Sequence, residues 1–152
     1  MELSIYVGHP ISGRPQEEIL DYYTKIDQEL TEMGYKVYHP MVGKGIVRND
    51  IKFRAETQGS DPICQNHAIK ERDKWMVQVT DIQIQDFTGA TMASIGCVSE
   101  LAWADLLNKH TVVVMDKTNI HRHAFVMEMA DIVFETLDEA KEYLRKLIKK
   151  EI

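Results

Sequence analysis

Residues 81–115 read DIQIQDFTGATMASIGCVSELAWADLLNKHTVVVM, and they give the clearest indication of the fold class. Its first part, Asp81–Phe87, is typical of a strand, and a glycine-containing turn follows it. The spacing then predicts a helix over Gly96–Asn108, and the β-branched run Thr111–Met115 is typical of the buried middle of a parallel sheet. A strand, a helix and a second strand with short connections form a right-handed βαβ unit.

The same alternation continues on both sides of this unit. Strands are predicted at Leu3–Gly8, Tyr35–Tyr38 and Ile132–Phe134, and helices at Pro15–Gly34, Ile63–Val79, within Asn119–Met129 and from the capping box Thr136–Glu139 onward. We therefore predict an α/β fold with a doubly wound, five-stranded parallel sheet, flavodoxin- or Rossmann-like, in the order 2-1-3-4-5 with helices on both faces. Ligands bind such sheets beyond the carboxyl ends of the strands, where the loops Gly8–Gly13 and Thr88–Gly96 are expected.

Length and composition predict one domain over residues 1–152, with 44% hydrophobic and 28% charged residues. The N-terminus lacks the features of a signal peptide, and no apolar run approaches a membrane span. The cysteines Cys64 and Cys97 are too few for a disulfide framework and fit a reducing cytoplasm. With 18 basic and 24 acidic residues the net charge is −6, which argues against binding to nucleic acid polymers or anionic membranes.

Residues 41–62 show no clean period and are rich in glycine and basic side chains. A segment of this kind is either a lid or binding loop, or a disordered surface insertion. The two tryptophans, Trp75 and Trp103, fall on apolar helix faces and are expected in the core.

Two carboxylates are candidates for catalysis. Glu100 comes about one turn into the helix after the glycine-containing turn, where it can act as a nucleophile or merely complement the helix dipole. Asp73 lies near the middle of the preceding helix, either converging on the same cleft or exposed within the charged run 70–74. Two carboxylates across a glycosidic bond can displace a leaving group from an anomeric carbon.

Other chemistries have less support. The loop Gly8–Gly13 lacks the glycine spacing of a dinucleotide fingerprint, and no Walker pattern is present, so nicotinamide redox chemistry and phosphoryl transfer from ATP lose their sequence support. The segment His121–His123 offers two histidines but no third metal ligand, so it predicts a metal site only weakly. It is either a basic cluster that meets an anionic group or a solvated loop.

Three segments together resemble the nucleoside 2-deoxyribosyltransferase family, which includes the 2′-deoxynucleoside 5′-phosphate N-hydrolases. They are Tyr6–Pro10, Glu71–Trp75 followed by Asp81, and Ser94–Ala104 followed by Asn108 and Lys109. The resemblance extends from the first strand to about Phe134, and the segment around Glu100 is its most specific part.

The resemblance implies that Glu100 is the nucleophile and forms a covalent deoxyribosyl intermediate. Asp73 assists the departing base or orients the sugar, while Tyr6, Gly8 and His9 line the base and sugar pocket, with Gly96 in the same site. It implies no cofactor and no metal, and it implies a homodimer or higher homo-oligomer with shared active sites. The segment 119–123, including His123, is then contributed by a neighbouring subunit.

The resemblance also implies that Ser94, six residues before Glu100, contacts the 5′ end of the substrate. In this family an aspartate at that position is typical of transferases that hold a 5′-hydroxyl, and a serine is typical of hydrolases that use a 5′-phosphate. A hydroxyl and backbone N–H groups accept a phosphate that a carboxylate repels. Nucleoside salvage by base transfer, nucleotide hydrolysis, an NAD-type glycohydrolase and a non-catalytic nucleotide sensor all remain open at this point.

Overall fold

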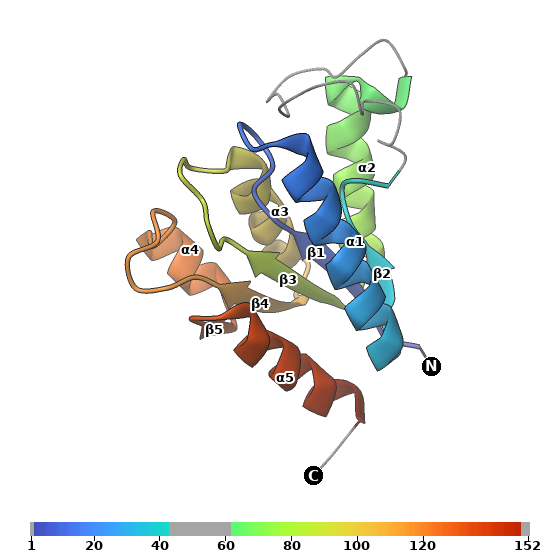
Figure 1. The fold of residues 1–152 in the computed structure, drawn as a ribbon, viewed down its shortest axis with the longest axis vertical. Coiled ribbons are helices and arrows are strands. Elements are labelled where there is room, and N and C mark those ends of the chain that lie inside the picture. The colour runs from blue at the N-terminus through green and yellow to red at the C-terminus, as the bar shows by residue number, and fades with distance from the viewer. Residues whose placement is uncertain (1, 43–61, 150–152) are drawn as a thin grey trace.

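The computed structural model describes residues 2–42 and 62–149. Its elements, in chain order, are β1 (Ser4–Gly8), α1 (Gln16–Met33), β2 (Lys36–Tyr38), a short 3₁₀ helix (Pro62–Cys64), α2 (Asn66–Val79), β3 (Ile82–Asp86), α3 (Ile95–Leu106), β4 (His110–Val114), α4 (Ala124–Met129), β5 (Ile132–Phe134) and α5 (Leu137–Lys149) (Figure 1). The described strands form one parallel sheet in the order β2-β1-β3-β4-β5, as predicted.

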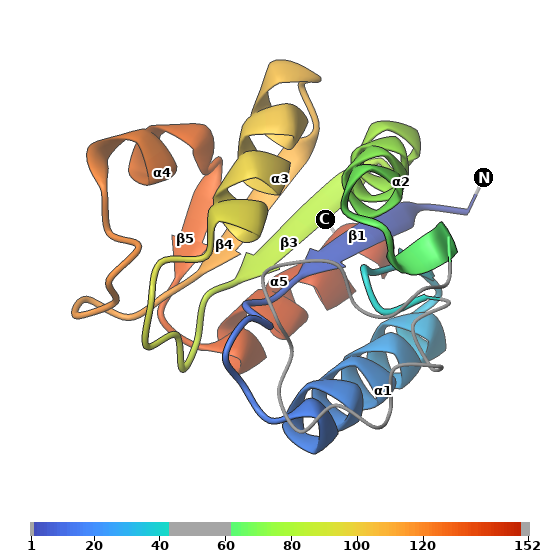
Figure 2. The ribbon, with the colours of Figure 1, turned by 90° about the horizontal axis from the view of Figure 1, so that it is seen from above.

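Helices cover both faces of this sheet, with α1 and α5 on one side and α2, α3 and α4 on the other (Figure 2). Successive side chains of a strand point to opposite faces of the sheet, so the sequence of each strand determines which residues lie on which face. Aliphatic residues of β1, β3 and β4 pack against α1 and α5: Ile5, Val7, Ile82, Ile84, Val112 and Val114. The alternate positions, including Tyr6 and Gln85, face α2 and α3, so this face of the central strands is partly polar.

Local signals set several element ends. The helix α1 ends at Gly34, whose φ of 105° is a left-handed conformation that glycine adopts without a Cβ penalty. Before α5, Thr136 Oγ1 accepts from the Glu139 backbone N–H (3.3 Å), and the Glu139 carboxylate accepts from the Thr136 N–H (3.0 Å), so the predicted capping box is confirmed.

Two expectations need correction. The helix predicted from Ile63 begins at Asn66, because the chain first forms the 3₁₀ helix and Gln65 then takes an extended conformation. Trp75 is 52% exposed, in edge-to-face contact with Tyr38, whereas Trp103 packs against the apolar cluster around Tyr6. The apolar stripe of α2 that faces the sheet is therefore built from Met76 and Val77 rather than Trp75.

The parallel strands direct the loops after β1 and β3 to the same edge of the sheet, at the predicted switch point. Of the segment 41–62, residues 43–61 lie outside the described part of the chain. Among residues 2–42 and 62–149, no helix has both the length and the apolar character needed to cross a membrane.

Candidate active site

Glu100 lies in the second turn of α3 and is 7% exposed. The hydroxyl of Tyr6, on β1, donates a hydrogen bond to its Oε1 atom at 2.9 Å. The amide of Gln85, on β3, donates to its Oε2 atom at 3.0 Å. Each carboxylate oxygen therefore has a donor from a different strand, an arrangement that holds the side chain in one orientation.

The Tyr6 hydroxyl also interacts electrostatically with the second carboxylate, that of Asp73. Burial raises the pKa of the Tyr6 hydroxyl well above its usual value, and the negative charges of Glu100 and Asp73 raise it further. The hydroxyl therefore stays protonated and donates at any physiological pH. Because both carboxylates act on this one phenol, the structure brings Glu100 and Asp73 to the same region between α2 and α3.

Asp73 is buried rather than displayed on the charged surface of α2, with 7% of its surface exposed. Its Oδ1 atom accepts from the guanidinium of Arg72, with a distance of 3.1 Å to Nη2. The same guanidinium donates to the carbonyl oxygens of Pro40 (2.8 Å) and Val42 (2.9 Å). Arg72 thus ties the position of Asp73 to the chain that follows β2.

The start of α3 is organised around Ser94. Its Oγ accepts from the Cys97 backbone N–H at 3.4 Å as a helix N-cap, and its own N–H donates to Nε2 of His121 at 2.8 Å. The imidazole of His121 is stacked on Phe87. A Cβ built on Gly96 would meet no atom within 4 Å, so the backbone of this first turn is open on that side.

The loop after β1 is fixed by a neutral histidine. Arg14 donates to Nε2 of His9 (2.7 Å), so the proton of the ring lies on Nδ1, which donates to the carbonyl oxygen of Asp86 (2.7 Å). The ring is stacked on Tyr22 with 3.7 Å between centroids. His9 is therefore part of a buried cluster at the carboxyl ends of β1 and β3.

Gly8 has a packing reason of its own. A Cβ built at Gly8 would lie 1.5 Å from Oε1 of Gln85, so any side chain at position 8 would displace the amide that contacts Glu100. Glycine at position 8 therefore leaves room for the Gln85 amide, in addition to the pocket-lining role expected for it.

The described contacts do not bring His123 to the two carboxylates. It is exposed, and its Nδ1 atom accepts from the Phe125 N–H (3.2 Å) as the N-cap of α4. His121 instead turns inward to Ser94, so the two histidines of this segment face different surroundings. A role for His123 in binding stays a prediction.

Sequence reasoning missed several residues of this site. Asp86 is 1% exposed and accepts from the hydroxyls of Tyr22 (2.8 Å) and Thr88, while Arg14 lies against the turn at Gly89. Gln85 was missed as well. The signal was present in the run Ile82–Asp86, where polar residues alternate with isoleucine in a strand that must be buried on both faces. Buried polar side chains in such a strand need partners.

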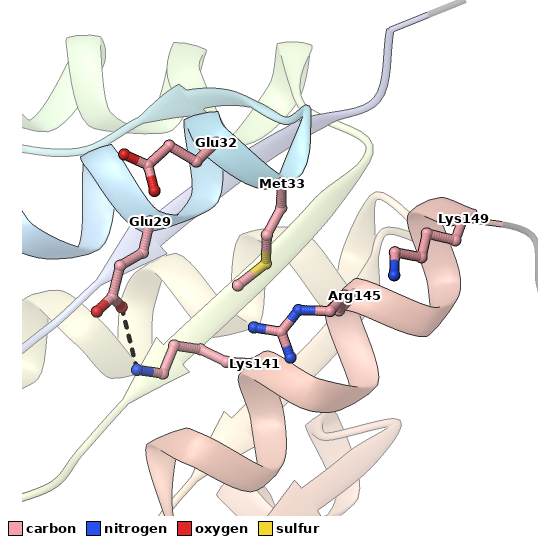
Figure 3. Close-up of a pocket in the computed structure, with 6 residues that line it drawn as sticks. All are labelled: Glu29, Glu32, Met33, Lys141, Arg145 and Lys149. Atoms are coloured by element: carbon pink, nitrogen blue, oxygen red, sulfur yellow. Dashed lines mark hydrogen bonds and ion pairs between the residues drawn. The ribbon is translucent and has the colours of Figure 1, made fainter.

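A pocket of about 420 Å³ lies elsewhere, between α1 and α5 (Figure 3). It is lined by Met33 and by charged residues: Glu29, Glu32, Lys141, Arg145 and Lys149. Lys141 pairs with Glu29 at 3.0 Å across the two helices. These helices cover the sheet face opposite to α2 and α3, so this pocket is separate from the candidate site (Figure 2).

Two buried histidines, His9 and His121, and the partly buried His39 predict that the stability of the fold is sensitive to mild acid. Burial lowers the pKa of His9, His39 and His121 below the usual 6.5. The unfolded chain therefore binds more protons than the folded chain as the pH falls through about 6.5, and stability is lost in that direction. We expect the melting temperature to fall by roughly 4 °C or more between pH 7 and pH 5.5, measured by circular dichroism.

A matched pair of variants measures the contribution of His121 to this pH dependence of the melting temperature. His121→Gln should flatten the pH dependence, whereas His123→Gln, which changes an exposed histidine two residues away, should leave it unaltered. Equal slopes in both variants and the parent would show that His121 does not contribute.

The sequence matches no protein-family model and no curated protein. Solved structures, in contrast, share the fold. A 2-deoxyribosyltransferase from Bacillus psychrosaccharolyticus superposes with a TM-score of 0.65 at 16% identity, covering 92% of this chain and 91% of its own. A 2-deoxyribosyltransferase from Leishmania mexicana gives 0.62 at 13% identity, covering 95% and 97%. A CMP N-glycosidase from Clostridium botulinum gives 0.56 at 14% identity, covering 97% and 99%.

These neighbours are enzymes, and the similarity spans nearly the whole of each chain. At such low sequence identity the similarity shows a shared fold and does not assign an activity to this chain. This chain has the flavodoxin-like fold of the 2-deoxyribosyltransferases, in agreement with the resemblance to that family seen in its sequence.

Proposed function

We propose that this protein cleaves the N-glycosidic bond of a 2′-deoxyribonucleoside or its 5′-monophosphate through a covalent intermediate on Glu100. The observation that carries the proposal is the buried Glu100 carboxylate, oriented by Tyr6 and Gln85 and accompanied by Asp73. The shared fold with 2-deoxyribosyltransferases and a CMP N-glycosidase supports the same reaction class.

In the first step, a carboxylate oxygen of Glu100 attacks C1′ and the bond from C1′ to the base breaks. The bonding electrons leave with the base nitrogen, and Asp73 donates a proton to the base or orients the sugar. A 2-deoxy sugar suits this step because it lacks the electron-withdrawing 2′-hydroxyl, so its oxocarbenium-like transition state forms more easily.

In the second step, water or another base attacks C1′ from the face that the first base has left. The ester to Glu100 breaks and its electrons return to the carboxylate. The attacking group gives its proton to Asp73 where Asp73 has protonated the first base, and to solvent water where Asp73 only orients the sugar. Two displacements give net retention at C1′. The proposed reaction uses no metal or organic cofactor, because Glu100 supplies the nucleophile and Asp73 supplies the proton or orients the sugar.

Product analysis tests the proposal. The protein is incubated with deoxynucleosides, deoxynucleoside monophosphates and CMP, each with and without a second free base, and products are separated by chromatography. A new nucleoside identifies a transferase, and free base with a sugar phosphate identifies a hydrolase. Release of nicotinamide from NAD alone, or binding without any product over hours, would overturn the proposal in favour of a glycohydrolase or a sensor.

We propose a 5′-monophosphate as the preferred substrate. Ser94 offers a hydroxyl at the N-terminus of α3, the first turn is open at Gly96, and Arg14 places a cation against the turn at Gly89. Backbone N–H groups at a helix N-terminus and a nearby guanidinium are donors that suit a phosphate.

The variant Ser94→Asp tests this preference cleanly, because aspartate also caps helices and should preserve α3. We expect kcat/KM for the monophosphate to fall about 100-fold, with less than a 3-fold change for the free nucleoside, since only the phosphate meets a like charge. Ser94→Ala serves as the control for the lost hydroxyl. Equal losses on both substrates would remove the argument for a phosphate.

We also propose a homodimer or larger homo-oligomer in the cytoplasm, with sites shared between subunits. Large apolar side chains are exposed on the neighbouring helices α3 and α4: Ile95 (82%), Leu106 (78%) and Phe125 (74%). Exposed apolar surface of this kind favours a protein partner. Ile95 adjoins Ser94, so a subunit placed there would reach the candidate site and could bring its own segment 119–123, including His123.

Sedimentation measures this assembly. We expect Leu106→Asp to shift the protein toward the monomer, with an increase of at least about 100-fold in the dissociation constant and a parallel loss of activity. Leu147→Asp, which places the same charge on α5 at the opposite face, should sediment like the parent. A monomeric parent with full activity would contradict shared sites.

A further inference from the structure

We infer that Gln85 is a positioning residue for the Glu100 carboxylate, which it orients through one shared amide. The inference rests on the proposed function and deepens it, because it identifies what prepares the nucleophile. Gln85 is fully buried at the carboxyl end of β3 and therefore acts through Glu100 rather than by touching the substrate.

The amide of Gln85 makes two hydrogen bonds from one nitrogen. Its Nε2 atom donates to the backbone carbonyl oxygen of Cys97 at 2.6 Å and to Oε2 of Glu100 at 3.0 Å. Both partners are acceptors on α3, one turn apart, so the amide joins the main chain of the helix and the carboxylate to β3. The hydrogen bonds also fix the orientation of the amide, because its oxygen in that place would face two acceptors.

The oxygen of the amide makes no comparable contact. Oε1 of Gln85 is buried without a hydrogen-bond partner among the described residues, and it occupies the space that a side chain at Gly8 would need. Leaving a buried carbonyl oxygen unpaired costs free energy. The amide therefore contacts α3 through its nitrogen.

The same strand supplies a matched control for this contact. Gln83 precedes Gln85 by two positions and so lies on the same face of β3, and it is equally buried. Neither polar atom of its side chain has a hydrogen-bond partner in the described structure. Gln83 therefore offers a matched control that has the same chemistry, strand and burial but no bond to Glu100.

The first experiment reads the carboxylate directly. Glutamate labelled with ¹³C at the carboxyl carbon is incorporated, the Glu100 signal is assigned by its absence in Glu100→Gln, and its titration midpoint is followed by NMR. In Gln85→Leu the carboxylate loses a donor, so the midpoint should move up by about one pH unit. In Gln83→Leu it should not move. An unchanged midpoint in Gln85→Leu would overturn the inference.

The titration must be interpreted among neighbours that also carry charge or protons. The titratable groups near Glu100, or near the groups that touch it, are Tyr6 on β1, Tyr23 on α1, Asp73 on α2, Asp86 on β3 and Cys97 on α3. All of them are retained in the two leucine variants. A shift confined to Gln85→Leu therefore belongs to the lost amide.

Gln85→Glu provides a second variant of nearly the same shape. The introduced carboxyl group can donate to Glu100 only when it is protonated, and two carboxylates at this distance cannot both ionise, so one proton is held to higher pH. We expect kcat of this variant, taken relative to the parent at the same pH, to fall as the pH rises through that raised midpoint. A purely structural role would give a loss that does not vary with pH.

Turnover completes the test and separates the two proposals. Gln85→Leu should lose about 10- to 100-fold in kcat with less than a 2-fold change in KM, since the residue does not reach the substrate. If the parent has no glycosidic activity but the midpoint still moves, the proposed function fails and the effect of Gln85 on Glu100 stands. If the parent is active and neither kcat nor midpoint changes in Gln85→Leu, the positioning role alone fails.

Discussion

Replacing Glu100 with glutamine is expected to reduce turnover at least about 10⁴-fold, equivalent to roughly 5 kcal/mol of lost transition-state stabilisation. An amide cannot form the glycosyl ester, so the route through the covalent intermediate closes. The fold should survive, because the new amide can keep its oxygen toward Gln85 while its nitrogen donates to the Tyr6 hydroxyl oxygen. Chromatography of the released base measures the loss.

The control for this variant lies on the same helix. Asp105→Asn removes an exposed carboxylate from α3 and should retain the parent activity. Mass spectrometry of the parent, quenched during turnover, should show one added deoxyribosyl group on the peptide that contains Glu100. Retention of more than about a tenth of the activity in Glu100→Gln would contradict the covalent mechanism.

Asp73→Asn is expected to have the next largest effect, a loss of roughly 10²- to 10³-fold in kcat, which is the range of general acid catalysis. The buried carboxylate is held by Arg72 at 3.1 Å and lies close enough to Tyr6 to raise the pKa of its hydroxyl. The isosteric amide keeps the shape of the side chain but supplies neither a proton nor a negative charge. Glu71→Gln, at an exposed acid of the same helix, is the matched control.

A change of leaving group separates the two roles proposed for Asp73. The base of 7-methyl-2′-deoxyguanosine is already cationic and departs without being protonated. If Asp73 is the acid, the loss in Asp73→Asn should shrink about 10-fold or more on this substrate; if it orients the sugar, the loss should be the same on both. A loss below about 3-fold on every substrate would remove Asp73 from the catalytic site.

The strongest sequence prediction was the fold, because it depends on patterns that are local. The strand-turn-helix unit around Ser94, the helix end at Gly34 and the capping box at Thr136 and Glu139 are set by residues within a few positions of one another. The wrong prediction for the start of α2 also has a local cause. The helical spacing of apolar residues extends back to Ile63, but the extended conformation of Gln65 separates Ile63 from the helix.

The amino-acid pattern is enough to predict the alternation of strands and helices, the order of the parallel sheet and a carboxylate soon after a glycine-containing turn. The side chains that contact this carboxylate are known only from the packed structure. Pairing of β1 with β3 places Tyr6 and Gln85 beneath Glu100, although Tyr6 is 94 residues away along the chain. Hydrogen bonds of this kind depend on which face of a strand meets which helix, and that is fixed only when the layers pack.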